Sequence, residues 1–378
     1  NLAELQNDCS KYFKISPDET LRIVQELYEK KMTTYPRTDA RVLSTAVAKE
    51  IHKNIGGLRN YALAAPFAKE VLEQGTYKNI AKTRYVNDKQ ITDHYAIIPT
   101  GQGLNNLAGL APTAAKVYEV IVRRFLSIFY PPAVYQKFSL TLQVKEESFF
   151  ASFKVLIQEG YLKVTNFSFK KENTALKEDK ENENESADEK CDAELTNLLT
   201  HLKKGDTLSV DTYEIKEGET SPPKRYTSGS IILTMENAGQ FIEDEELRAQ
   251  IKGSGIGTSA TRAEILKKLV NIEYLALNKK TQVLTPTQMG EMIYDVVSDS
   301  IRPLLNPALT ASWEKGLTMV ADGVITPDDY MGKLTDFVGR RTVAVRGLNN
   351  QGVLWRQFQA TEEFYQKKQK QSNAKNKE

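Results

Sequence analysis

Tyr35 and Arg37 are separated by one residue in the segment Tyr-Pro-Arg-Thr-Asp. A phenol can attack phosphorus as it approaches phenolate character, and a nearby guanidinium can stabilise the charge that develops on the phosphoryl oxygens. Pro36 favours an extended backbone at the residue before it, and residues i and i+2 of an extended segment share a face. The pattern predicts that Tyr35 and Arg37 converge on one phosphate, although a surface tyrosine near an arginine is common.

His94 is the second candidate, in the segment Asp-His-Tyr-Ala-Ile-Ile-Pro-Thr. An imidazole changes its charge near physiological pH, so it can hydrogen-bond a phosphate or transfer a proton. A packed or capping histidine is the alternative. His52 and His201 lie in helical contexts and are expected to face solvent. Three histidines in unlike contexts and two distant cysteines predict neither a metal site nor a disulfide framework in this chain.

Two further segments could bind phosphate. Residues 255–262 read Gly-Ile-Gly-Thr-Ser-Ala-Thr-Arg, and residues 222–227 read Pro-Pro-Lys-Arg-Tyr-Thr. Glycines before a helix permit close approach, and a helix N-terminus offers free N–H groups and threonine hydroxyls to an anion. An ordinary turn that ends in a capped helix is the alternative, because Gly-x-Gly lacks the spacing of a dinucleotide or Walker loop.

Helices are expected around the tyrosine. A capping signal at Ser16 predicts a helix that ends near Lys30, a second helix is expected from Ser44, and a third over residues 112–129. Residues 1–130 are therefore predicted to form a mainly helical domain.

Residues 131–220 are predicted to form a β-rich domain. Apolar and polar residues alternate over 138–144, and strands are also expected over 150–157 and 207–215. The acidic stretch from about 170 to 192 interrupts them and has the composition of a solvated or disordered insertion.

Residues 221–340 are expected to be helical again, with a hairpin between two helices. N-cap candidates begin at Thr258, the hairpin turns near residues 278–280, and another helix begins near Thr287. This order is typical of a winged-helix unit, which often contacts nucleic acid but also serves in protein–protein modules. Residues 341–378 are expected to form a basic tail.

The composition is that of a globular protein with no membrane span or signal peptide, and it favours an intracellular setting. The net charge of +2 conceals a more basic body. Residues 171–194 contain ten acidic and four basic residues, and the rest of the chain contains 47 basic and 39 acidic residues. Such a body is compatible with nucleic acid. Because the first residue is not Met, we expect a piece of a longer chain.

Together with the helix that carries Arg123, these motifs resemble type IA DNA topoisomerases in their order and spacing over roughly residues 1–340. The Ile-Ile-Pro-Thr and Gly-Thr-Ser-Ala-Thr-Arg-Ala forms are most similar to the topoisomerase III branch. The resemblance implies a multidomain α+β fold, a torus fragment with winged-helix-like helical domains and a β-rich arch. It also implies cleavage and religation of one DNA strand.

The resemblance gives roles to individual residues. Tyr35 matches the nucleophile that becomes linked to a 5′ phosphate, Arg37 the arginine that stabilises this phosphate, and His94 a histidine near the active site. Buried ion pairs are the alternative for Arg225 and Arg123. The implied DNA-binding positions are Thr258, Ser259, Thr261, Arg262, Arg225 and Arg123.

The departures from the family pattern have consequences. The family's N-terminal domain, which carries acidic Mg²⁺ ligands and a catalytic Glu, has no counterpart here, so this chain is expected to need no cofactor itself and to be catalytically incomplete. Ala40 replaces a frequent serine, and Tyr95 stands where the branch often has a second histidine. The intact enzyme is expected to use Mg²⁺.

Single-stranded DNA is the expected partner, with no membrane and no known protein partner, in a cytoplasmic, nucleoid-associated setting. The first alternative is a non-catalytic winged-helix nucleic-acid-binding protein. A tyrosine recombinase or relaxase is less favoured, because those enzymes need a His and Arg cluster or a three-histidine metal site.

Overall fold

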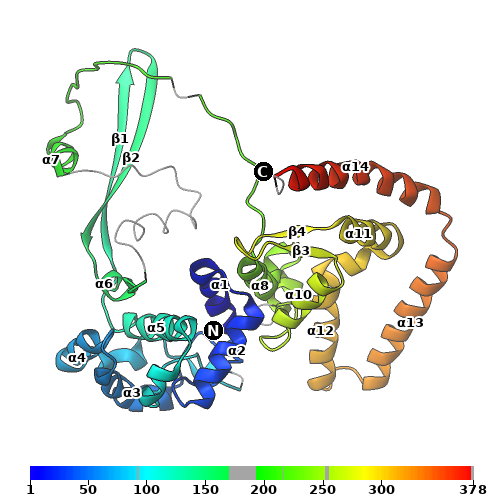
Figure 1. Ribbon diagram of the computed structural model, residues 1–378, viewed down its shortest axis with the longest axis horizontal. Coiled ribbons are helices and arrows are strands. Elements are labelled where there is room, and N and C mark those ends of the chain that lie inside the picture. The colour runs from blue at the N-terminus through cyan, green and yellow to red at the C-terminus, as the bar shows by residue number, and fades with distance from the viewer. Residues whose placement is uncertain (92, 170–192, 216, 252–254, 376–378) are drawn as a thin grey trace. The chain divides into compact units, whose positions relative to one another are not determined.

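The computed structural model describes residues 1–91, 93–169, 193–215, 217–251 and 255–375 (Figure 1). The chain is a mixed α and β protein in which helices predominate, and its described strands form two antiparallel pairs. The acidic insertion predicted at 170–192 lies outside the described residues. None of the helices in the described ranges is both long and apolar enough to cross a membrane.

Unit 1 is a compact body made of residues 1–26, 35–41 and 224–378. The Tyr35 segment and the first helix therefore belong with the C-terminal part of the chain. The helices and strands of unit 1 are α1 (Leu2–Phe13), most of α2 (Pro17–Glu29), α8 (Ser228–Glu236), α9 (Glu245–Ile251), α10 (Arg262–Asn271), β3 (Leu275–Leu277), β4 (Leu284–Pro286), α11 (Gln288–Ile301), α12 (Pro307–Ala321), α13 (Pro327–Arg346) and α14 (Gln351–Lys375).

α1 and α8 pack closely within unit 1 (Figure 1). Gly229 makes this possible, because a Cβ atom there would lie 2.7 Å from the Cα atom of Asn7 and 2.8 Å from the Cβ atom of Ser10. The buried cluster Ala3, Ile232, Leu266 and Leu284 joins α1 and α8 to α10 and β4. The apolar side chains of four sequence-distant elements thus form one core.

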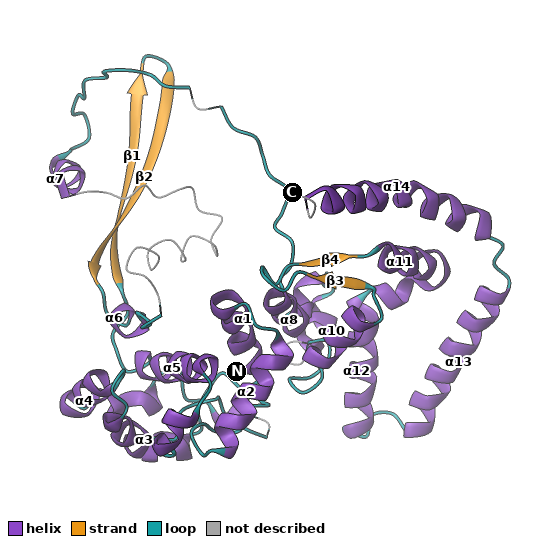
Figure 2. Ribbon diagram, viewed as in Figure 1, coloured by secondary structure: helices purple, strands orange, loops and turns teal. Residues whose placement is uncertain are grey.

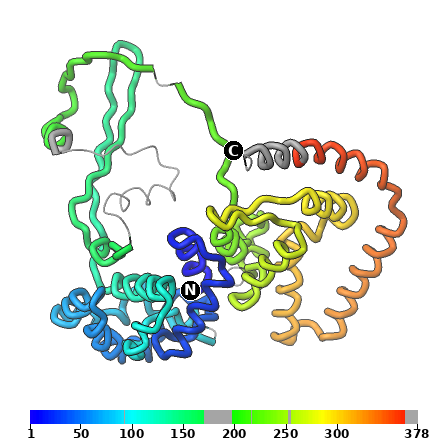
Figure 3. Tube along the Cα trace, viewed as in Figure 1, coloured from blue at the N-terminus to red at the C-terminus, as the bar shows by residue number. Residues whose placement is uncertain are grey.

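The helix, hairpin and helix predicted after residue 257 are confirmed as α10, β3–β4 and α11. The Thr287 hydroxyl caps α11 by accepting a hydrogen bond from the Gly290 amide at 3.0 Å. The chain then continues through α12, α13 and α14 (Figure 3). Trp313 of α12 packs edge-on against Tyr330 and Phe337 of α13.

Unit 2 is a compact body made of residues 27–34 and 42–223. Its buried side chains come mainly from α3 (Thr45–Gly57), α4 (Ala65–Gln74) and α5 (Pro112–Ser127), and Val117, Tyr118 and Leu126 of α5 are inaccessible to solvent. The α-helices and strands of unit 2 are the end of α2, α3, α4, α5, β1 (Val134–Val144), β2 (Glu147–Gln158), α6 (Leu162–Thr165) and α7 (Ala193–His201), and short 3₁₀ helices lie between them.

β1 and β2 form a long antiparallel ribbon (Figure 2). Phe138 pairs with Phe153 and Leu142 with Phe149, so apolar residues share one face. These two strands confirm the sequence prediction. The third predicted strand, over residues 207–215, is wrong, since in the described residues this extended segment has no strand pairing. Its alternating pattern did not specify a neighbouring strand.

The predicted helix starts around the tyrosine are also confirmed. The Ser16 hydroxyl accepts a hydrogen bond from the Glu19 amide at 3.2 Å, and α2 begins at Pro17. The Ser44 hydroxyl accepts one from the Val47 amide at 3.1 Å and caps α3. Local capping chemistry fixes these helix boundaries.

Candidate active site

The segment from Tyr35 to Arg41 alternates between two environments. Pro36, Thr38 and Ala40 are buried, whereas the residues between and beside them are half-buried or exposed. A hydrogen bond of 3.0 Å from the Thr38 amide to the Pro36 carbonyl bends the backbone at Arg37. Because the alternation has period two, Tyr35 and Arg37 are both outward residues of this segment.

The beginning of α1 holds this segment within unit 1. The Leu2 amide donates to the Thr38 carbonyl at 3.1 Å, and the Asn1 side-chain amide donates to the Asp39 carbonyl at 3.3 Å. The Thr38 hydroxyl accepts from the Ala40 amide at 3.0 Å. The backbone that follows Tyr35 therefore has partners at three successive residues.

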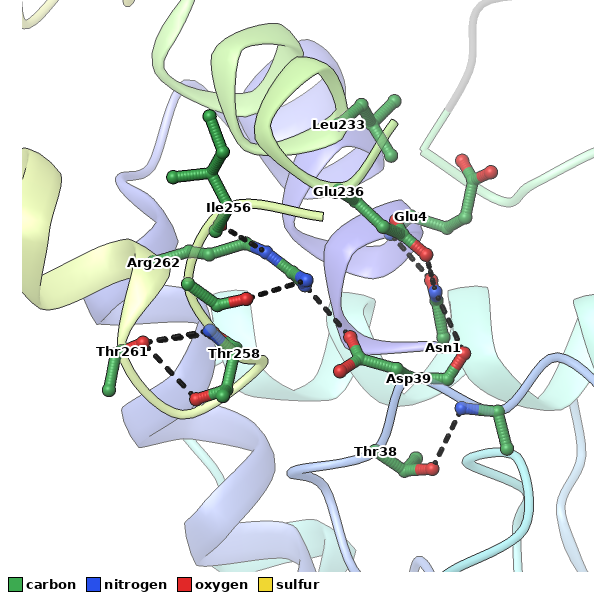
Figure 4. A network of polar contacts seen from close by, with 12 residues as sticks. Asn1, Glu4, Thr38, Asp39, Leu233, Glu236, Ile256, Thr258, Thr261 and Arg262 are labelled. Atoms are coloured by element: carbon green, nitrogen blue, oxygen red, sulfur yellow. Dashed lines mark hydrogen bonds and ion pairs between the residues drawn. The ribbon is translucent and has the colours of Figure 1, made fainter. Parts of the chain in front are cut away.

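Arg262 also holds the Tyr35 segment in place, through an ion pair with Asp39 of that segment (Figure 4). The Arg262 side chain is 1% exposed, and its Nη1 atom lies 2.8 Å from Asp39 Oδ1. Its Nε and Nη2 groups donate to the Ile256 and Gly257 carbonyls at 3.2 and 3.1 Å. Separating a buried guanidinium from its carboxylate partner would leave an uncompensated charge, so this contact is costly to break. The ion pair joins the Tyr-Pro-Arg-Thr-Asp motif to the Gly-Thr-Ser-Ala-Thr-Arg motif.

The loop before α10 presents hydroxyl groups at the surface. Thr258 and Thr261 are exposed, their hydroxyl oxygens lie 3.1 Å apart, and the Thr258 amide donates to the Thr261 hydroxyl at 2.9 Å (Figure 4). Gly255 has a φ of +66°, and a Cβ atom there would lie 2.3 Å from the Met235 carbonyl oxygen. This glycine therefore permits the turn that orients the loop against α8.

Arg41 forms the second charged anchor of the segment. Its guanidinium pairs with Glu4 of α1 and donates to both carboxylate oxygens of Glu236 at 3.1 Å. Burial disfavours the charged form of Arg41, but the hydrogen bonds and charges of these two carboxylates outweigh it and raise the pKa of Arg41. Arg37 differs, since in the described part of the chain it has no ion pair with a carboxylate.

The acidic residues of this region are thus engaged by arginines, Asp39 by Arg262 and both Glu4 and Glu236 by Arg41. Over the ranges that the structure describes, no group of three His, Cys, Asp or Glu side chains is arranged to hold a metal ion. These residues do not fit a Mg²⁺ site, because carboxylates that neutralise arginines are poor candidates for cation ligands.

The motif that contains His94 pairs with the residues directly before Tyr35. Within unit 2, the Thr34 amide donates to the Ile98 carbonyl at 3.0 Å, and the Thr34 hydroxyl donates to the Ala96 carbonyl at 3.2 Å. His94 itself is exposed and belongs to unit 2, whereas Tyr35 belongs to unit 1. A shared role of these two residues stays a prediction.

The remaining predicted residues differ in exposure. Arg225 is exposed in unit 1, and Ser259 is half-buried beside Thr258. Arg123 lies in unit 2 and is 7% exposed; it pairs with Glu119 at 2.7 Å. The buried ion pair was the alternative for Arg123, and this geometry does not present it to a DNA backbone.

Sequence reasoning assigned no role to Asp39 or Arg41, although both anchor the Tyr35 segment. The motif contains Asp39, but its partner Arg262 is 223 residues away. Arg41 and Glu236 are separated by 195 residues. Residue spacing along one sequence carries no signal for such pairs.

Comparison with known proteins identifies the family. The DNA topoisomerase family model matches residues 1–332. DNA topoisomerase 3 of Bacillus licheniformis is 32% identical over 92% of this chain and 45% of its own length, and that of Bacillus subtilis is 34% identical over 85% and 41%. The chain thus spans less than half the length of these relatives. With this match, the chain belongs to the type IA DNA topoisomerase family and is topoisomerase III-like.

Proposed function

We propose that the protein containing this chain cleaves and reseals one strand of DNA, with Tyr35 as the nucleophile. The observation that carries this proposal is the Asp39–Arg262 ion pair, because it brings the tyrosine motif and the Gly-Thr-Ser-Ala-Thr-Arg motif into one unit. The family match and the outward position of Tyr35 and Arg37 support it.

The proposed step exchanges one phosphoester for another. The Tyr35 phenol oxygen forms a bond to phosphorus while the bond from phosphorus to the 3′ oxygen breaks. The phenol gives up its proton, and the leaving 3′ oxygen takes one, which yields a 5′-phosphotyrosine and a free 3′ hydroxyl. Attack by this hydroxyl reverses the step. Among the described residues Arg37 pairs with no carboxylate, so its guanidinium is suited to the charge that develops on the phosphoryl oxygens.

We assign Arg262 a positioning role in this reaction. Its guanidinium is buried and occupied by Asp39 and two carbonyl groups, so it orients the tyrosine segment rather than contacting DNA. The exposed hydroxyls of Thr258 and Thr261 remain suitable for a DNA phosphate. Ser259 and Arg225 are weaker members of the proposed DNA-binding surface.

We further propose that α10, β3–β4 and α11 act as a winged-helix unit that receives a single strand, and that the β1–β2 ribbon belongs to an arch. The exposed loop before α10 supports the first assignment, and the length and exposure of the ribbon support the second. Mg²⁺ is expected for the intact enzyme, where it would neutralise phosphate charge. Asp39, Glu4 and Glu236 pair with arginines, so we assign these carboxylates no role as ligands of the ion.

The test is a denaturing-gel assay for a covalent adduct between 5′-phosphoryl DNA and the protein. It compares the full-length protein, its Tyr35→Phe variant and this chain, with single-stranded DNA and Mg²⁺. We expect an adduct in the full-length protein and none in the variant. An adduct that survives Tyr35→Phe would disprove the assignment of the nucleophile.

If no protein forms an adduct but all bind DNA, the non-catalytic winged-helix alternative would be correct. An adduct formed by this chain without the rest of the protein would show that cleavage needs no further domain.

A further inference from the structure

A second basic surface lies in unit 2, outside the tyrosine motif. The 3₁₀ helix η2 (Thr76–Lys82) and the residues after it carry Lys78, Lys82 and Arg84, all of which are exposed. Ile80 is 3% exposed and anchors η2, so the two lysines lie on its outer side. We call Lys78, Lys82 and Arg84, with Tyr77 and Tyr85, the η2 surface.

The η2 surface is fixed to α3 and to the chain before it. The Leu43 amide donates to the Tyr85 carbonyl at 2.8 Å, and the Asn87 amide donates to the Leu43 carbonyl at 3.1 Å. The Tyr77 ring lies 6.3 Å from the ring of His52 on α3. The cations are therefore displayed by an ordered part of unit 2.

The cations of the η2 surface differ from several lysines of unit 2 that pair with carboxylates. Among residues that the structure describes, Lys78, Lys82 and Arg84 form no ion pair with a carboxylate. The nearby acid, Asp88, instead accepts from the Thr45 amide and hydroxyl at 2.8 and 2.6 Å. Three other exposed lysines of unit 2 do form ion pairs.

Those pairs are Lys53 with Glu50, Lys69 with Glu73, and Lys163 with Glu70.

Aromatic side chains accompany these cations. The Arg84 guanidinium lies over the Tyr85 ring at 5.3 Å from its centroid, and its Nη2 atom lies 3.4 Å from the Tyr85 hydroxyl. Both tyrosines are half-buried, so part of each remains accessible. Cations that neutralise phosphates beside aromatic rings that stack on bases are the chemistry of single-stranded nucleic-acid binding.

We propose that the η2 surface is a second contact for single-stranded DNA, separate from the residues of the candidate active site. It rests on the proposed function only for the choice of DNA as the ligand. Its role is to hold the strand by its backbone while other residues act on it. Because such binding releases counterions, it must weaken as salt rises.

The experiment measures binding of a fluorescent oligothymidylate to this chain as a function of salt. The variant carries Lys78→Glu, Lys82→Glu and Arg84→Glu. The control carries Lys137→Glu, Lys203→Glu and Lys204→Glu, which make the same change in net charge at exposed positions of unit 2.

We expect the η2 variant to lose roughly tenfold or more in affinity at low salt, with a salt slope shallower by about two, and the control to change little. Glutamine at the three η2 positions should give a smaller loss in the same direction, and circular dichroism checks that each variant is folded.

Equal losses in the η2 variant and the control would overturn the proposal, because net charge alone would then explain the effect. An unchanged salt slope would also overturn it. A parallel titration with a duplex of the same length covers the other case: a loss for the duplex with no loss for the oligothymidylate would overturn the proposal, because the surface would then serve double strands. Because no covalent step is measured, these results are independent of whether Tyr35 proves to be the nucleophile.

Discussion

Arg262 in unit 1 and Arg123 in unit 2 are both buried and both paired with a carboxylate, but they join very different parts of the chain. Arg262 reaches Asp39, 223 residues away, whereas Arg123 pairs with Glu119 one helical turn earlier in α5. Both also donate to backbone carbonyls. One arginine thus supports a joint within unit 2, and the other holds the segment that carries the candidate nucleophile.

The Arg123 joint is the more completely buried of the two pairs. Glu119 is 1% exposed and also accepts from the amide and hydroxyl of Ser168 at 2.8 and 2.6 Å. Arg123 donates to the Leu63 and Val164 carbonyls at 3.1 Å. It therefore links α5 to the residues before α4 and to α6, at the base of the ribbon.

The largest effect is expected from Arg123→Met. The change leaves the buried Glu119 carboxylate without its cation, which should cost about 3–5 kcal/mol of stability. Hydrogen–deuterium exchange of the α5 and α6 amides is the appropriate measurement, because it reports unit 2 separately from the rest of the chain. We expect protection in both helices to fall.

Arg124→Met is the matched control, since this neighbouring arginine is exposed. It should leave exchange almost unchanged. If both substitutions have the same small effect, the Arg123–Glu119 pair does not stabilise the joint.

The next effect is expected from Asp39→Asn in the full-length protein. The change removes the charge that holds Arg262, so the Tyr35 segment should lose its precise orientation. Small displacements of a reacting group can cost about a hundredfold in rate, and we expect cleavage to slow by roughly ten- to a hundredfold. DNA affinity should change little, as measured by single-turnover cleavage and separate binding titrations.

Asp18→Asn controls for the loss of a carboxylate in unit 1, because Asp18 pairs with Lys267 at an exposed position. A result in which Asp39→Asn weakens DNA binding but leaves cleavage of bound DNA unchanged would contradict the positioning role. Arg262 would then belong to the DNA-binding surface that the family resemblance implies.

The sequence could predict local structure but not the contacts that Arg262 and Arg123 make across the chain. Capping residues and alternation determine local structure, so the helix starts at Ser16 and Ser44 and the first two strands were predicted correctly. The candidate site came from motifs and not from geometry. The family resemblance implied DNA binding for both Arg262 and Arg123, with a buried ion pair as the alternative for Arg123, and only the folded chain reveals their carboxylate partners.

The prediction of a third strand was wrong for a related reason. Residues 207–215 have a strand-like pattern, but a strand exists only when another strand edge accepts its hydrogen bonds. In the described part of the chain, β1 and β2 pair with each other alone. The alternation of residues within a segment does not reveal which distant strand, if any, pairs with it.

The smallest effect is expected at an exposed ion pair beside the Arg123 joint. Lys163 of α6 pairs with Glu70 of α4 at 2.8 Å, and the Tyr130 hydroxyl donates to the same carboxylate at 2.7 Å. The hydrogen bond from Lys163, followed by that from Tyr130, holds the pKa of the Glu70 carboxyl below its usual range. Because the side chains are partly exposed, the pair should contribute less than about 1 kcal/mol.

Glu70→Gln tests whether the partly exposed Lys163–Glu70 pair contributes less to stability than the buried Arg123–Glu119 pair. Since the pKa of Glu70 is lowered by folding, its contribution is present above the pKa of the unfolded chain and is lost as pH falls through the folded value. The difference in α4 and α6 protection between the original chain and Glu70→Gln should therefore be small near neutral pH and vanish in acid. A loss as large as that of Arg123→Met would mean that the number of hydrogen bonds, rather than burial, determines the strength of the joint.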